Sequence, residues 1–244
     1  HPPQIGRDQV HDDSILDFDM LQTGHSGYDS VGHTVKCIRA ERDRKPTMPV
    51  MIGEVNYEGI LHGNHAELQR LTFWSSFLSG SAGFTYGANG IWQFNTKNQI
   101  YGQSPHGANW GNTPWEDAYQ LPGSHQLGLA KKLLEQFPWQ EFEPHQEWVD
   151  NQGGPDKADG LFAAGIPKQI RVIYFYTPTY PWSPDRFHVV KLESEVNYTA
   201  YFWDPRTGQE HDIGPIIADA DNSWAIPIQP TMDDWVLVLT AGSS

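Results

Sequence analysis

The chain has 244 residues, of which 38% are hydrophobic and 13% aromatic, which is enough for a sizeable core and excludes a wholly disordered protein. Its formal net charge is −14 at pH 7 and no basic face is evident, which argues against nucleic acid and anionic membrane surfaces as partners. No apolar run approaches the roughly 18 residues of a membrane span, and the single cysteine excludes an internal disulfide framework.

Predicted strands alternate with predicted helices over residues 1–137. We expect strands at 15–22, 50–53 and 83–86, and helices at about 31–41, 65–79 and 115–137, the last one broken near Leu121-Pro122-Gly123. This alternation predicts a parallel sheet covered by helices. Three such units do not close a barrel that needs eight, and taken alone they leave an open sheet edge.

The pattern changes near residues 148–155. Helical spacing gives way to short alternating runs separated by turn residues, at 170–176, 197–203, 224–228 and 235–239. Several short strands at this spacing predict a small antiparallel β-sandwich. The predicted fold class is therefore α/β plus all-β, with a first domain at 1–147 and a β-sandwich at 148–244.

The segment 48–58 contains the most informative candidate residue. Its apolar run Val50-Met51-Ile52 ends at Gly53, which is the pattern of a buried strand in a parallel sheet, and Glu54 follows directly. In α/β barrels the reacting groups lie at the carboxyl ends of strands, where the backbone is rigid and the loops open to substrate. Glu54 is placed like a reacting group. The alternative is a glutamate that caps the next helix.

Several blocks of sequence in consistent order span nearly the whole chain and resemble one known family. In the first part these are His1–Arg7, Leu16–His25, Gly53–Glu58, Gly83–Gln93, Ser104–Gly107, Trp110-Gly111 and Pro114–Gly123. Together they resemble the apiosidase-like family, glycoside hydrolase family 140. Residues 203–208 and 233–239 are similar to the small β-domain that follows in that family and carries the label of a collagen-binding domain.

The resemblance implies a TIM barrel ahead of this β-domain. Under it, the chain begins near the end of the fifth barrel strand and supplies the C-terminal half of a (β/α)8 barrel. It implies a bacterial glycoside hydrolase, secreted or periplasmic, that acts on an oligo- or polysaccharide of plant type, with apiose-containing pectin as the family precedent. The missing N-terminal half of the barrel is then a partner needed to complete the site, and this chain alone is expected to be inactive.

Glycosidases usually need two carboxyl groups, one to protonate the leaving oxygen and one to attack or to activate water. By its resemblance to the family pattern, Glu54 on the seventh barrel strand is the nucleophile of a retaining mechanism. The acid/base in the family is an Asp at the end of the fourth strand, which this chain does not contain. Asp17 and Asp19 are poor substitutes, because we expect them within a strand and not at its mouth.

Further candidates for substrate binding follow the first two strands. His25 comes after Gln22 and is expected either to bind a sugar hydroxyl or to orient Glu54. His1 has the matching place after the missing fifth strand. Tyr57 is expected to line the site, and Glu58 to support it through a hydrogen bond.

A second group of candidates follows the strand at 83–86. Tyr86, Asn89 and Trp92 combine aromatic rings, which suit the C–H face of a sugar, with an amide, which suits its hydroxyls. The alternative for Trp92 is packing in the core. His106, in the long loop that follows, is expected at the rim of the pocket.

The sequence predicts neither a cofactor nor a metal. His62 and His65 lack the i, i+4 spacing and the adjacent glutamate of a zincin helix, and no phosphate-binding Gly-rich loop appears. The rival to an enzyme is a non-catalytic carbohydrate- or protein-binding module. That function gains weight if the chain acts alone, because it contains only one half of the expected catalytic pair.

Overall fold

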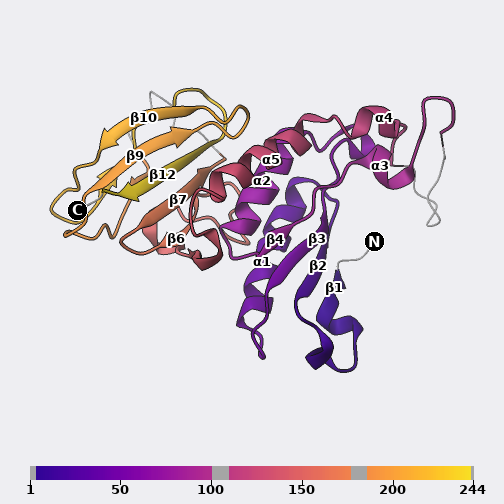
Figure 1. Ribbon diagram of the computed structural model, residues 1–244, viewed down its shortest axis with the longest axis horizontal. Coiled ribbons are helices and arrows are strands. Elements are labelled where there is room, and N and C mark those ends of the chain that lie inside the picture. Colours follow the sequence, from indigo (N-terminus) through magenta and orange to yellow (C-terminus); the bar gives the residue numbers. More distant parts are fainter. Residues whose placement is uncertain (1–3, 101–109, 177–185, 243–244) are drawn as a thin grey trace.

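The computed structural model describes residues 4–100, 110–176 and 186–242. Within these ranges the molecule has two main sheets with helices between them (Figure 1). The two-sheet arrangement confirms the mixed class predicted from the sequence, with helices and strands alternating first and antiparallel strands afterwards.

The first sheet has four strands in the order β1-β2-β3-β4. Strands β2, β3 and β4 pair in parallel, as the alternating pattern predicted, whereas the short β1 pairs antiparallel with β2. The bounds are β1 Gln4–Ile5, β2 Asp19–Gly24, β3 Val50–Val55 and β4 Gly83–Phe84. Because the three parallel strands have the same direction, the loops after their carboxyl ends lie at one edge of the sheet.

The first strand predicted from the sequence, 15–22, was wrong at its start. Residues Asp13–Ile15 form a 3-10 turn, η2, in which the Asp12 carboxylate accepts a hydrogen bond from the Ser14 backbone N–H. Ile15 is 70% exposed and Asp17 precedes the strand, which begins only at Asp19. Local side-chain capping therefore overrides the apolar pattern.

The helices follow the strands that the sequence indicated. The predicted break near Leu121-Pro122-Gly123 is confirmed, because α5 begins at Pro122, a residue suited to a first helical turn. The bounds are α1 Tyr28–Asp43, α2 Ala66–Phe77, α3 Asn89–Gln93, α4 Trp115–Ala118 and α5 Pro122–Leu134, with 3-10 turns η1 Gly6–Gln9, η3 Ile60–His62, η4 Trp139–Glu141 and η5 Gln146–Trp148. The short α3 was not predicted.

The second sheet has six strands in the order β10-β9-β12-β7-β6-β5, all antiparallel, and a separate two-stranded sheet pairs β11 with β8. The bounds are β5 Glu143–Pro144, β6 Phe162–Ile166, β7 Ile170–Phe175, β8 His188–Val189, β9 Tyr198–Trp203, β10 Glu210–Pro215, β11 Trp224–Ala225 and β12 Trp235–Ala241. Strand β5 precedes the boundary that we placed at residue 148, so pairing in this sheet starts slightly earlier than the composition suggested.

The central strands of the six-stranded sheet carry buried apolar side chains on both faces. One face packs on α2 and α5 through side chains such as Trp74 and Tyr174, whose ring centroids are 6.0 Å apart. The other face packs against the two-stranded sheet, with Val189 and Ile226 in the same apolar cluster as Leu237. Helix α2 therefore contacts the antiparallel sheet directly, and this helix follows the loop that begins at the end of β3 (Figure 1).

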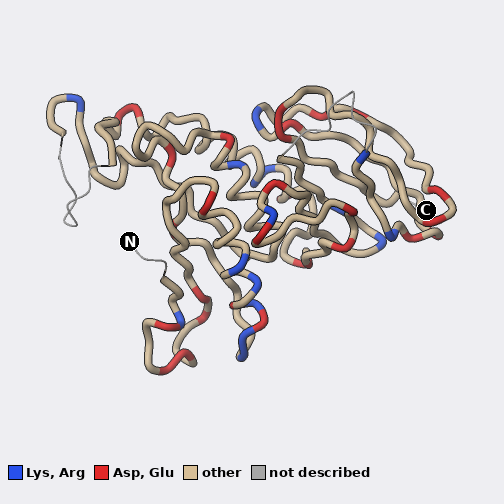
Figure 2. The backbone as a smooth tube through the Cα atoms, turned by 180° about the vertical axis from the view of Figure 1, so that it is seen from behind, with Lys and Arg blue, Asp and Glu red and all other residues tan. Residues whose placement is uncertain are grey.

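Charged residues are scattered over both parts of the chain, and the acidic ones predominate (Figure 2). Over the described ranges no helix combines the length and apolar character needed to cross a membrane.

Candidate active site

Glu54 lies at the carboxyl end of β3, which extends to Val55, beyond the predicted end at Gly53. In the register of the parallel pair, Glu54 lies beside Gln22 of β2. The Glu54 side chain is 25% exposed, so its carboxylate is partly accessible to a ligand. The predicted position of this residue at a strand end is therefore confirmed.

Two neighbours bind the Glu54 carboxylate. Gln22 Nε2 donates to Glu54 Oε1 over 2.8 Å, and His25 Nε2 lies 2.8 Å from the same oxygen. The Tyr57 side chain lies nearby: burial, followed by the charge of Glu54, raises the pKa of Tyr57 well above its usual range. The phenol is therefore a donor at neutral pH.

The geometry around His25 determines which of its ring nitrogens carries the proton. The Tyr57 backbone N–H donates to His25 Nδ1 over 3.4 Å, so Nδ1 is an acceptor and carries no proton. Nε2 then carries the proton and donates it to Glu54 Oε1. The His25 and Tyr57 rings also contact each other, with centroids 4.5 Å apart. His25 thus donates to Glu54 through Nε2 and accepts from Tyr57 through Nδ1.

A pocket opens beside this cluster. Its lining comprises His25, Glu54, Tyr57, Ile60, Asn89, Trp92 and Trp110. Trp92 is 42% exposed, which rules out the core-packing alternative for this side chain. Asn89 is 1% exposed, and its amide atoms have no hydrogen-bond partner among the described residues. The pocket thus combines one carboxylate with aromatic rings and an amide.

Two of the predicted residues are engaged elsewhere. Glu58 is 2% exposed and accepts hydrogen bonds from the Tyr86 hydroxyl at 2.6 Å and from the Gly123 backbone N–H at 3.0 Å. Burial raises the pKa of Glu58, while these two donors lower it. Glu58 thus links Tyr86, which follows β4, to the first turn of α5. Neither Glu58 nor Tyr86 lines the pocket.

Two predicted residues, His1 and His106, lie outside the described residues. Among the residues that the structure describes, no group of three or more His, Cys, Asp and Glu side chains is arranged to hold a metal ion.

Sequence reasoning missed Asn56, which lies between Glu54 and Tyr57. Asn56 is fully buried and has a positive φ of 41°. An asparagine inside a short loop between two candidate site residues is the available signal, because Asn tolerates this backbone region better than most residues. Ile60 was missed as well, and nothing in the pattern of the sequence distinguishes it.

A carboxylate bound by two donors at the end of a parallel strand, beside tryptophan and amide groups in a pocket, is an arrangement typical of active sites and ligand pockets. The profile of the family described as "Apiosidase-like, catalytic domain" matches residues 1–141. The chain therefore belongs to the apiosidase-like family, as its sequence blocks predicted.

Solved structures support the same class. A glycoside hydrolase is 26% identical, with a TM-score of 0.75 over 94% of this chain. A glycoside hydrolase family 5 protein from Bacteroides vulgatus ATCC 8482 is 23% identical and shares the fold, with a TM-score of 0.77 over 97% of this chain. The chain spans about half the length of both, 53% and 54%. Among curated proteins none matches this chain.

Proposed function

We propose that this chain supplies the nucleophile of a retaining glycoside hydrolase, and that Glu54 is this nucleophile. The Glu54 carboxylate attacks the anomeric carbon, and the bond from that carbon to the leaving oxygen breaks as a carboxylic acid gives its proton to this oxygen. A covalent glycosyl ester forms. Water, deprotonated by the same second carboxyl group, then attacks the anomeric carbon and releases Glu54 with net retention.

The arrangement of donors around Glu54 is the observation that carries this proposal. Gln22 and His25 both donate to Oε1, so the side chain is held in one orientation. A nucleophile needs such fixed placement, because orientation relative to the anomeric carbon determines much of the rate. A helix-capping glutamate would instead bind backbone N–H groups, and none is bound by Glu54 among the described hydrogen bonds.

The second carboxyl group is proposed to come from outside this chain. Under this proposal residues 1–147 are the C-terminal half of a (β/α)8 TIM barrel, residues 148–244 are a β-sandwich, and an upstream half supplies the acid/base Asp. One observation supports it: the related structures are about twice as long.

The substrate class follows from the family. We propose a plant-type polysaccharide of the pectin kind, with an apiose-containing linkage, as the substrate, and a secreted or periplasmic bacterial enzyme. The Trp92 ring would stack on a sugar face, and His25 and Tyr57 would border the bond that is cleaved.

The test compares this chain with an upstream-extended form on a panel of aryl glycosides that includes apiosides. We expect turnover with retention only in the extended form, and its loss in Glu54→Gln with the melting temperature unchanged. Glu135→Gln, at a half-exposed site just past the end of α5, is the matched control and should retain full activity. Substantial activity of Glu54→Gln would overturn the assignment. Sugar binding without turnover in the extended form would favour a binding module.

A further inference from the structure

Asn56 joins the two loops that surround Glu54. Its side-chain amide pairs with both backbone polar groups of one residue: Gly27 N donates to Oδ1 over 3.1 Å, and Nδ2 donates to Gly27 O over 3.0 Å. Its backbone N–H donates to Gly24 O over 3.1 Å. Asn56 therefore binds the segment 24–27 on both sides of His25.

The same residue is bound to α2. Gln69 Nε2 donates to the Asn56 carbonyl oxygen over 2.5 Å, and Asn56 Nδ2 lies 3.3 Å from Thr72 Oγ1. Both partners are fully buried, as is Asn56 itself. Every polar group of Asn56 is thus paired inside the protein, so none is left to bind a ligand.

These contacts connect Asn56 to the geometry of the carboxylate. Asn56 immediately precedes Tyr57, whose backbone N–H fixes the tautomer of His25, and His25 in turn donates to Glu54. One buried amide thereby sets the distance between the loop that carries His25 and the loop that carries Tyr57.

From this arrangement we propose that Asn56 is a positioning residue, which holds His25 in hydrogen-bonding reach of Glu54. The proposal rests on the proposed function only for its kinetic consequence; the positioning itself is independent of the substrate.

The residue type fits this role. At φ 41° a β-branched or bulky residue would be strained, whereas Asn and Gly are tolerated. Of these two, only Asn also presents one donor and one acceptor to the backbone C=O and N–H of Gly27. An Asp would place a second acceptor against Gly27 O and lose the hydrogen bond. Asn56→Gly therefore removes the amide without straining the backbone, and Asn56→Asp keeps the shape but reverses one contact.

The first readout needs no substrate. In the full-length protein labelled with 15N-histidine, long-range 1H–15N spectra report which ring nitrogen of each imidazole carries the proton, and His25→Gln assigns the signal. We expect His25 to be protonated at Nε2 alone in the wild type, and to lose this single tautomer in Asn56→Gly and Asn56→Asp. The matched control is Asn222→Gly, an exposed asparagine with φ 57° in a remote turn, which should leave the His25 signal unchanged.

The second readout is kinetic, with a 4-nitrophenyl apioside as the probe. A small misplacement of reacting groups costs on the order of 100-fold in rate, so Asn56→Gly should lower kcat by about this factor with little change in KM. If Asn56 acts through His25, the double variant with His25→Ala should lose no more activity than His25→Ala alone. Leu237→Ala, in the outer core of the antiparallel sheet, should lower the melting temperature and leave kcat unchanged.

The outcomes separate the two proposals. An unchanged His25 tautomer in Asn56→Gly, or multiplicative losses in the double variant, overturns the positioning role. If Asn56→Gly changes the His25 tautomer but the wild type hydrolyses no glycoside, the positioning role is supported and the proposed function is contradicted.

Discussion

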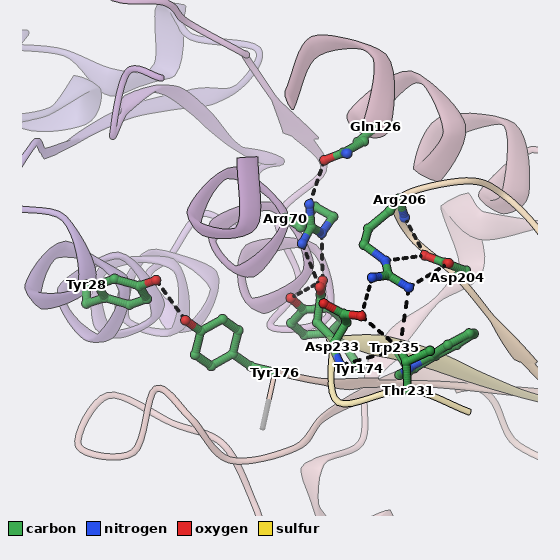
Figure 3. A network of polar contacts seen from close by, with 11 residues as sticks. Tyr28, Arg70, Gln126, Tyr174, Tyr176, Asp204, Arg206, Thr231, Asp233 and Trp235 are labelled. Carbon is green, nitrogen blue, oxygen red and sulfur yellow. Dashed lines mark hydrogen bonds and ion pairs between the residues drawn. The ribbon is translucent and has the colours of Figure 1, made fainter. Parts of the chain in front are cut away.

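Arg70 of α2 and Asp234, which directly precedes β12, form a two-pronged ion pair although they lie 164 positions apart in the sequence. Arg70 Nε donates to Oδ2 over 2.8 Å and Nη2 to Oδ1 over 2.7 Å, with side chains only 7% and 3% exposed. Tyr174 donates to the same carboxylate over 2.9 Å, and Gln126 accepts from Arg70 Nη1 over 2.6 Å. Figure 3 shows this network with the Tyr28–Tyr176 hydroxyl pair at 2.8 Å. The antiparallel sheet is thereby bound to the helix that contacts the loop after Glu54.

Removal of one partner of this pair should destabilise the protein strongly. Asp234→Ala leaves the Arg70 guanidinium buried without its counter-charge, which typically costs about 3–5 kcal/mol. We expect urea unfolding to show a loss of this size. The control is Glu135→Ala, which breaks the exposed pair with Lys131 and should cost at most a few tenths of a kcal/mol. A loss below about 1 kcal/mol for Asp234→Ala would show that the pair contributes little.

A second carboxylate beside Glu54 should reduce turnover. Gln22→Glu replaces the N–H donor, 2.8 Å from Glu54 Oε1, with a like charge. The loss of one charge-assisted hydrogen bond is worth about 1.5–3 kcal/mol, so kcat of the upstream-extended enzyme should fall by about 10- to 100-fold. Steady-state kinetics on the best aryl glycoside measures this change.

The control for this prediction makes the same chemical change elsewhere. Gln120→Glu lies at an exposed position beyond α4 and should leave kcat unaltered. Equal activity of both variants would mean that Gln22 does not orient the carboxylate.

The sequence could predict the parts of the site that depend on local pattern. Glu54, Gln22 and His25 were each predicted as site residues at or just after the end of a strand, and the carboxyl ends of parallel strands meet at one edge. Glu58 shows the limit of this reasoning. It is near Glu54 in sequence, but its direction depends on Tyr86 and on the first turn of α5, which the strand pattern does not report.

Contacts between distant segments could not be predicted in the same way. Arg70 and Asp234 pair only because α2 packs on the antiparallel sheet, and no periodicity in the sequence reports that docking. The start of β2 was wrong for a different reason: the Asp12 side chain stabilises a turn through residues that look apolar enough for a strand.

The single thiol should react slowly in the folded protein. Cys37 is 9% exposed, and burial, followed by the charge of Glu41, raises the pKa of its thiol. Because the thiolate is the reactive form, we expect modification by an aromatic disulfide reagent at pH 8 to be at least about tenfold slower than in urea. Because the pKa of the Cys37 thiol is raised, the rate should continue to rise with pH beyond the pH range over which a free thiol ionises. A folded-state rate equal to that in urea would indicate that α1 opens readily.

Glu58 should make the stability depend on pH with a defined sign. Burial raises the pKa of Glu58 in the folded state above the ordinary value of 4.5. Between pH 4.5 and this raised pKa, the folded state retains a proton that the unfolded state has lost. The contribution of Glu58 to stability is therefore fully present below pH 4.5 and is lost as pH rises through the raised pKa. The free energy of unfolding of the wild type minus that of Glu58→Gln should fall over this window.

A second variant tests the cause of this pH dependence. The Tyr86 hydroxyl donates to Glu58 over 2.6 Å and lowers its pKa, which opposes the effect of burial. Tyr86→Phe removes this donor, so the pKa of Glu58 should rise further and the fall in stability should extend to higher pH. Urea unfolding at a series of pH values measures both effects. A wild-type advantage that grows with pH would contradict the sign, because it would require a lowered pKa of the Glu58 carboxyl in the folded state.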